Sequence, residues 1–326
     1  MTAITVLAGG VGGARFVRGL RQHLEQLDAI GAGGPSSITV VANTGDDLWL
    51  AGLRVCPDLD SLMYTLAGAN DEVRGWGRVG ESERVSAELT AYGVGWPWFT
   101  LGDLDLATHI ARTSMLRDGL TLSEATERLT ARWDLGVTLV PATDDEVETH
   151  VEVGDPVREL HFEEWWVRHR AALPARRFVQ RGIETAAASP RALEAIAAAD
   201  VVLVAPSNPV VSIGTILELP GMRAALSATG APVIGVSPII AGAAVRGMAD
   251  ACLAAIGVET SAAAVASHYG ARSTGGLIDG WLVDDADAAS LPALEAAGIR
   301  TAAVPLWMTD AAATAKIARD ALALAT

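Results

Sequence analysis

The first 42 residues alternate between strand and helix patterns, and this alternation constrains the fold more than any other feature. The segments are an apolar run at 4–7, a glycine-rich turn at 8–13, an amphipathic pattern at 14–27 and a β-branched run at 38–41. Continuous apolar runs are typical of strands buried on both faces, and such strands alternating with helices form parallel sheets. Similar runs return at 201–205 and 233–236. We therefore predict an α/β fold with a Rossmann-like, mostly parallel sheet.

The middle of the chain has a different character. Residues 71–188 hold many of the tryptophans and arginines and few long β-branched runs, and amphipathic helical patterns cover 122–133 and 163–172. We predict that 1–75 and 186–326 form a Rossmann-like nucleotide-binding core. The segment 76–185 is then a mostly helical insertion.

Composition excludes several classes of protein. Half of the residues are hydrophobic, so the chain is not disordered, and its net charge of -15 with a single lysine argues against a nucleic-acid binder. Cys56 and Cys252 are too few for a disulfide scaffold, and the first residues lack the charged region of a signal peptide. The charge-free stretch 224–245 is interrupted by proline and glycine, as a membrane span would not be. We expect a cytoplasmic protein without a nucleic-acid or membrane partner.

The glycine-rich turn is a candidate phosphate site. Gly9, Gly10, Gly12 and Gly13 lie between the first strand and the first helix, where backbone N–H groups can approach a phosphate. The turn matches neither the GxGxxG dinucleotide pattern nor a Walker P-loop cleanly, and by itself it is weak evidence.

Carboxylates crowd the loops that follow the second strand. Asn43, Asp46 and Asp47 come directly after it, and Asp58 and Asp60 precede or begin a helix near 61–66. Carboxylates this dense repel one another, and Mg²⁺ would relieve the repulsion because it takes oxygen ligands from carboxylates and substrate phosphates. The alternative is that each aspartate caps a helix or turn. We predict that the four aspartates together form a site for such a cation, with Asn43 as a neighbouring substrate contact.

Two further strands end in a hydroxyl or amide residue before a proline. Ser207 and Asn208 precede Pro209, and Ser237 precedes Pro238. Each turn could simply cap a helix whose first residue is the proline. Two such turns opposite a glycine-rich loop would also form a ligand crevice at the sheet edge.

Taken together, the motifs identify a resemblance. The stretches that carry it are AGGVGGAR at 8–15, NTGDDLWLAGLRVCPDLDSLMYTLAG at 43–68, WGR at 76–78, WFTLGDLDLATHIARTSMLRDGLTLSEAT at 98–126, PATDDEVETHV at 141–151, PSNPVVSI at 206–213 and SPIIAGAAVRG at 237–247. In this order they resemble the 2-phospho-L-lactate transferases of coenzyme F420 biosynthesis, including the phosphoenolpyruvate-using actinobacterial branch. The resemblance spans nearly the whole chain.

The resemblance implies a Mg²⁺-dependent transfer of a phosphoenolpyruvyl or 2-phospho-L-lactyl group. The donor would be a diphospho-5'-guanosine compound and the acceptor the ribityl hydroxyl of the deazaflavin Fo, with release of GMP. Asp46 and Asp60 would be catalytic, as metal ligands or by orienting the acceptor. Asp60→Ala would abolish transfer without unfolding the protein. The insertion would help to form the acceptor site, and the family expectation is a homodimer.

The family pattern also implies further substrate contacts. Asp60 and Thr100 look like deazaflavin contacts, although the family often has lysine where this chain has Thr100. The guanosine diphosphate side would be lined by Gly9 to Gly13, Ser207, Asn208 and Ser237. Asp103, His109 and Arg112 are further candidates, of which Arg112 could meet a phosphate.

Two other classes compete with the transferase. One is a sugar-nucleotide-binding regulator of the same superfamily, which shares the glycine-rich loop but is not an enzyme. The other is an NAD-dependent oxidoreductase, which the missing third glycine disfavours. Whether the donor carries enolpyruvate or lactate stays open.

Overall fold

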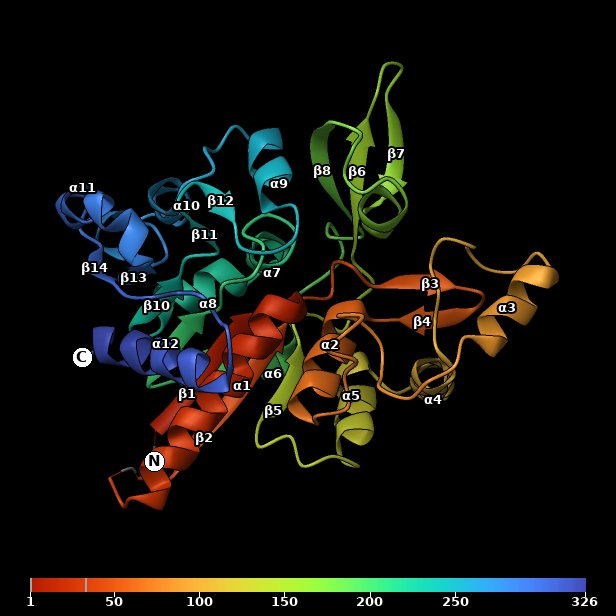
Figure 1. Ribbon diagram of the computed structural model, residues 1–326, viewed down its shortest axis with the longest axis horizontal. Helices are drawn as coiled ribbons and strands as arrows, with labels where there is room; N and C mark the ends of the chain where they lie inside the picture. The colour runs from red at the N-terminus through yellow and green to blue at the C-terminus, as the bar shows by residue number, and fades with distance from the viewer. Residues whose placement is uncertain (1, 33) are drawn as a thin grey trace.

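In a computed structural model, which describes residues 2–32 and 34–326, seven strands form one parallel sheet in the order β14-β13-β10-β9-β1-β2-β5 (Figure 1). These strands are β1 (Thr2–Ala8), β2 (Ser36–Ala42), β5 (Thr138–Pro141), β9 (Val201–Val204), β10 (Val233–Val236), β13 (Gly280–Val283) and β14 (Arg300–Ala303). The order runs outward in both directions from β1, as in a doubly wound Rossmann sheet, and reverses between β1 and β9. The predicted Rossmann-like α/β fold is confirmed.

Both faces of the sheet are covered because its strands are apolar on both sides. Val6 and Val40 point into one core, while Leu7 and Val41 point into the other. The helices that bury side chains in the first core are α1 (Gly10–Ala29), α2 (Pro57–Leu66), α5 (Leu122–Thr130) and α12 (Ala311–Leu324). Those of the second are α6 (Pro190–Ala197), α7 (Ile213–Glu218), α8 (Met222–Ala228), α9 (Ala249–Ala255), α10 (Ala262–Tyr269) and α11 (Leu291–Ala296).

The helical character expected for 76–185 holds only in its first half. There, α3 (Arg84–Ala91) and α4 (Asp103–Arg117) lie beside the hairpin of β3 (Leu48–Leu50) and β4 (Leu53–Val55), away from the main sheet (Figure 1). The second half contributes β5 to the main sheet and then forms a separate antiparallel sheet of β6 (Glu148–Val153), β7 (Arg158–His161) and β8 (Ala175–Arg181). The helix expected at 163–172 is a single π-helical turn, η1 (Glu164–Arg168).

The proline turns also differ from expectation. Pro209 does not begin a helix, because α7 starts only at Ile213. Pro238 leads into a small hairpin of β11 (Ile239–Ile240) and β12 (Ala243–Ala244), with Ser237 Oγ accepting from the Ile239 N–H. Short 3-10 turns, η2 (Arg272–Thr274) and η3 (Asp285–Ser290), complete the chain. Among residues 2–32 and 34–326, no helix is long and apolar enough to span a bilayer.

Candidate active site

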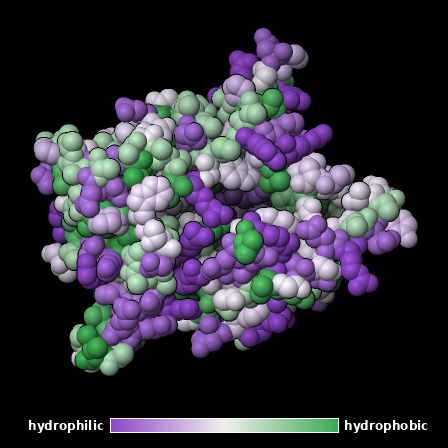
Figure 2. Space-filling model, in the orientation of Figure 1, coloured by the Kyte–Doolittle hydropathy of each residue, from purple (hydrophilic) through white to green (hydrophobic). Residues whose placement is uncertain are grey.

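A cavity of about 590 Å³ opens at the carboxyl ends of the strands, beside the point where the strand order reverses. The loops after β1, β2, β9 and β10 all contribute to its wall. Figure 2 shows a hollow near the middle of the face in view, bordered mainly by hydrophilic side chains. Of the residues predicted from the sequence, those that line the cavity are Gly9, Gly10, Gly12, Asp46, Ser207, Asn208 and Ser237. An open α/β sheet binds its ligands at this place.

The glycine-rich turn packs closely against the turn after β9. Ser207 Oγ accepts from the Gly9 N–H at 3.0 Å and donates to the Gly9 carbonyl at 2.7 Å. A Cβ on Gly12 would lie 2.9 Å from the Pro206 carbonyl oxygen, so only glycine fits this contact. Helix α1 begins at Gly10, earlier than the sequence pattern indicates. Ser207 therefore holds the turn in place, and the exposed part of the first helical turn faces the cavity.

Asn43 positions a carboxylate and is itself fully buried. Its amide nitrogen donates to Asp58 Oδ2 at 2.9 Å, and its oxygen accepts from the Gly45 N–H at 3.0 Å. Asp58 also accepts from the Gly10 N–H, so it stands directly at the glycine-rich turn. A Cβ on Gly9 would lie 2.5 Å from Asp58 Oδ2. Asn43 thus links the end of β2 to the start of α2.

Helical geometry separates the two aspartates of α2. Successive residues of a helix are rotated by about 100°, so Asp58 and Asp60 point roughly 200° apart. Asp58 lines the cavity, whereas Asp60 points toward α4 and does not line it. Asp46 and Asp47 also point to different places. Asp46 lines the cavity, whereas Asp47 does not and lies 3.6 Å from the Arg54 guanidinium. The structure therefore groups Asp46 with Asp58, and not with Asp60.

Three buried carboxylates form what we call the acidic end of the cavity: Asp46, Asp58 and Glu163. Burial, reinforced by Asp58 and Glu163, holds the pKa of Asp46 well above its usual range. Burial raises the pKa of Asp58 to about 6, and burial together with Asp58 raises that of Glu163 to about 8. One oxygen of Asp46 is buried without a hydrogen-bond partner in the part of the chain described here. These features suit a hard divalent cation, which prefers oxygen ligands.

The acidic end should make stability depend on pH in the metal-free protein. Asp58 and Glu163 have ordinary pKa values of 3.8 and 4.5, and folding raises them to about 6 and about 8. Because the folded protein binds these protons more tightly than the unfolded chain, the two groups add to the free energy of unfolding in full below about pH 4. This added stability is lost as the pH rises to about 8. We expect these two shifts to lower the free energy of unfolding by about 5 kcal/mol between pH 5 and 8, and most of this loss comes from Glu163.

Urea denaturation of the metal-free protein at several pH values measures this loss. Glu163→Gln should flatten the upper part of the profile, because its amide does not titrate. A wild-type profile that stays flat or rises over this range would contradict the expectation.

The other two aspartates belong to a buried arginine cluster, which we define as Asp47, Arg54, Asp60 and Arg112. Arg112 donates to Asp60 in a very short contact and to the Arg54 carbonyl at 3.2 Å. Burial raises the pKa of Asp47 to about 7 in spite of Arg54. His109 adjoins the cluster, with Nδ1 3.5 Å from Asp60 Oδ2.

The cluster borders a second possible metal group. Asp60, Asp105 and His109 offer ligand atoms within 4.8 Å of one another. However, Arg112 already supplies a positive charge to Asp60. Within residues 2–32 and 34–326, no cationic side chain forms an ion pair with Asp46, Asp58 or Glu163, so the acidic end fits a metal better than Asp60 does.

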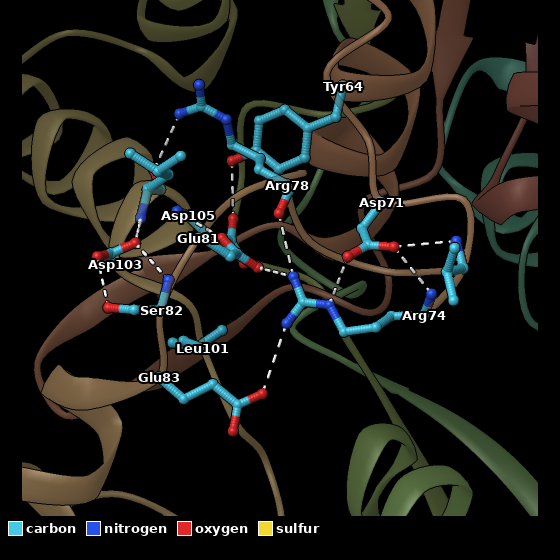
Figure 3. A network of polar contacts seen from close by, with 12 residues as sticks. Tyr64, Asp71, Arg74, Arg78, Glu81, Ser82, Glu83, Leu101, Asp103 and Asp105 are labelled. Atoms are coloured by element: carbon cyan, nitrogen blue, oxygen red, sulfur yellow. Dashed lines mark hydrogen bonds and ion pairs between the residues drawn. The ribbon is translucent and has the colours of Figure 1, made fainter.

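Three further predicted substrate contacts lie outside the main cavity. Asp103 stands at the start of α4, where it accepts from the N–H and the hydroxyl of Ser82, and these bonds lower its pKa (Figure 3). Thr100 borders a separate hollow of about 30 Å³. Gly13 is buried, and a Cβ there would lie 2.7 Å from Ser207 Oγ. The structure does not bring these three residues into the main cavity, and a role for Thr100 or Asp103 in binding stays a prediction.

The cavity also contains residues that the sequence patterns did not single out. They are Glu163 at the acidic end, Arg15 and Arg246, and the tryptophans Trp76, Trp166 and Trp307. Arg15 ends the first motif of the resemblance and Arg246 falls in the last, so motif position was a usable signal for these two. Glu163 lies in a segment that resembles an ordinary helix start, and nothing in the sequence marks it.

The fold and the cavity define a Rossmann-like α/β protein with its main cavity at the topological switch point. The crystal structure of protein BH3568 from Bacillus halodurans, a member of the UPF0052 family, has a similar fold, with a TM-score of 0.62 and 17% identity over 98% of this chain and 99% of that one. Residues 4–315 match the family 2-phospho-L-lactate transferase CofD, and this chain belongs to that family.

Curated relatives agree with the family. A phosphoenolpyruvate transferase of Streptomyces griseus is 56% identical over 324 residues, which cover 99% of this chain and 98% of that protein. Proteins of the same name from Thermobifida fusca and Mycolicibacterium smegmatis are 57% and 54% identical, over 99% of this chain and 97% and 98% of their own lengths. The chain is thus a member of a transferase family that acts on small molecules.

Proposed function

We propose that this protein transfers a phosphoenolpyruvyl group from a diphospho-5'-guanosine donor to the ribityl hydroxyl of Fo, 7,8-didemethyl-8-hydroxy-5-deazariboflavin. GMP would be released and dehydro coenzyme F420-0 formed. The observation that carries the proposal is one cavity in which the glycine-rich turn faces the acidic end. The names of the relatives favour the enolpyruvyl donor, and a 2-phospho-L-lactyl donor is the variant of the same reaction.

The residues of the cavity suit displacement at a diphosphate. The acceptor hydroxyl oxygen forms a new bond to the phosphorus that carries the enolpyruvyl group, and the bond from that phosphorus to the GMP oxygen breaks. The hydroxyl proton is released to solvent, and GMP leaves with the bridging oxygen. A diphosphate at the glycine-rich turn would meet the Asp58 carboxylate, and this repulsion calls for a cation between them. We assign Asp46 and Asp58 as the residues that would hold Mg²⁺, which supplies charge neutralisation on the diphosphate when bound.

We propose that Fo reaches the acidic end with its ribityl chain, with the segment around Thr100 and α4 as the neighbouring wall. Asp60 lies behind this wall, where Arg112 holds it, so a direct contact between Asp60 and Fo needs a local rearrangement. The cytoplasmic location and the homodimer that the resemblance implies remain part of this proposal.

Turnover with defined substrates tests the function. The purified protein is incubated with Fo, the enolpyruvyl donor and Mg²⁺, and GMP and the deazaflavin product are measured by mass spectrometry. We expect one GMP for each product formed, with the lactyl donor used more slowly. No product from either donor, although the protein is folded and binds GDP, would favour the nucleotide-binding regulator.

Removal of the metal gives a second expected result. Chelation with EDTA should lower the rate at least a hundredfold, because the diphosphate then meets uncompensated carboxylates. Addition of excess Mg²⁺ should restore the rate, and this recovery controls for damage by the chelator. A rate that EDTA leaves unchanged would refute the metal assignment.

A further inference from the structure

The wall of the main cavity carries both carboxylates and arginines. The acidic end lies beside the glycine-rich turn, while three arginines, Arg15, Arg74 and Arg246, line the rest of the wall. Arg74 already has ion-pair partners within the protein, namely Asp71 at 2.9 Å and Glu81 at 2.6 Å (Figure 3). The other two arginines form no ion pair within 4 Å among the residues that the structure describes. Cations without partners in a ligand cavity point to an anionic group on the ligand.

The two free arginines come from different parts of the chain. Arg15 lies in α1 and Arg246 follows β12. Arg246 reaches across to the segment that carries Trp76, because a Cβ on Gly75 would lie only 2.7 Å from its Nη2 atom. Gly75 has φ of +79°, a conformation that glycine adopts without strain. Arg246 thus spans the cavity from one wall to the other.

The two guanidinium groups also influence each other. Burial, together with the charge of Arg15, lowers the pKa of Arg246. The nearby carboxylate Glu72 is bonded to Arg18 at 2.7 Å, and the charge of Arg15 helps to lower the pKa of Glu72 without an ion pair within 4 Å. Two like charges that line one cavity repel each other, and a bound anion would relieve this repulsion.

The proposed donor has one anionic group that no residue discussed so far accounts for. The glycine-rich turn and the acidic end with its cation would serve the diphosphate, and guanosine carries no charge. The carboxylate of the transferred group remains. A planar guanidinium matches a carboxylate in a two-bond contact, which gives recognition as well as binding.

We propose that Arg15 and Arg246 recognise the carboxylate of the transferred phosphorylated three-carbon acid. This inference rests on the proposed function and deepens it. The pair distinguishes the donor from GMP, which has no carboxylate. It also accounts for two arginines without ion-pair partners in a cavity that otherwise holds several carboxylates.

Binding of two fragments of the donor tests the assignment. Phosphoenolpyruvate carries the carboxylate, whereas GDP carries the guanosine and the diphosphate. Calorimetric titrations in Mg²⁺ compare the wild type with Arg15→Gln and Arg246→Gln. Arg300→Gln is the matched control, because Arg300 is exposed on β14 and does not line the cavity.

We expect each cavity variant to bind phosphoenolpyruvate at least tenfold more weakly and GDP within threefold of the wild type. The control should bind both as the wild type does, and thermal melts should show that all variants are folded. An equal loss for GDP would mean that the arginines hold phosphate, and this would overturn the carboxylate assignment. Unchanged phosphoenolpyruvate affinity in both variants, or no binding by the wild type, would overturn it as well.

Failure of the proposed function would give a different pattern. The wild type would then form no product from Fo and either donor. The contrast between phosphoenolpyruvate and GDP in the arginine variants is independent of turnover. The two ideas can therefore fail separately.

Discussion

Asp46→Asn is expected to lower kcat for transfer roughly a thousandfold without destabilising the fold. The substitution keeps the shape of the side chain but removes a charge that the cavity would use to hold a cation. Asp46 is buried beside two other carboxylates, and its pKa is raised by burial and by that repulsion. A neutral amide relieves the repulsion, so the free energy of unfolding of the metal-free protein near pH 7 should be equal to or above that of the wild type.

Turnover and urea denaturation of the same preparation separate these two effects. Asp285→Asn is a matched control, because Asp285 is exposed and lies outside the cavity. It should leave both quantities unchanged. If Asp46→Asn retains turnover within tenfold of the wild type at saturating Mg²⁺, Asp46 is not part of the reaction site.

Arg112→Leu is expected to lower the free energy of unfolding by about 3–5 kcal/mol. Arg112 is 1% exposed and is the cation that contacts Asp60. Without it, Asp60 would be a buried carboxylate with no arginine partner among the described residues, and its remaining basic neighbour is the His109 ring, with Nδ1 at 3.5 Å. Removal of one partner of a buried ion pair is costly because the other partner keeps its desolvation penalty.

A double-mutant cycle tests this reason for the loss. Arg112→Leu combined with Asp60→Leu should recover part of the stability, since two apolar side chains can replace a buried ion pair. Arg117→Leu is the control on the same helix, because Arg117 is exposed, and it should change stability by less than about 1 kcal/mol. A loss of the same size in this control would show that the effect belongs to α4 and not to the ion pair.

The ion pair between Arg112 and Asp60 also changes the result expected for Asp60→Ala. The sequence suggests a substitution that removes activity and leaves the fold intact. In the structure, Asp60→Ala leaves the buried Arg112 guanidinium without its carboxylate. We therefore expect a loss of stability as well, and activity alone cannot assign a role to Asp60.

The core strands could be predicted because they are continuous apolar runs, such as 38–41 and 201–204. Strand β6 was missed although its burial alternates, with Thr149, Val151 and Val153 inside. That period of two is typical of an antiparallel strand with one exposed face. Strand β5 has only four residues, too short to show a period. Its place in the main sheet depends on pairing with β2, which is a tertiary contact.

For the site, sequence could find the acidic loops but not the direction of each carboxylate. Helical spacing alone shows that Asp58 and Asp60 cannot both face one cavity. Which of the two aspartates faces the cavity depends on what packs against α2. Asp60 faces Arg112, which lies 52 residues further along the chain, so local sequence does not show this contact. Glu163 is 105 positions from Asp58, and only the folded chain brings the two together.

The contacts around Arg74 connect the cavity to the α3–α4 region. Arg74 bonds to Asp71 and Glu81, while Ser82 is bonded to Asp103 at the first turn of α4 (Figure 3). Arg74 also lies over the ring of Trp76, which forms part of the cavity wall. A molecule that displaces the start of α4 must therefore break these bonds or carry the tryptophan with it. Occupancy of the two substrate sites would then be thermodynamically linked, and each substrate would alter the affinity for the other.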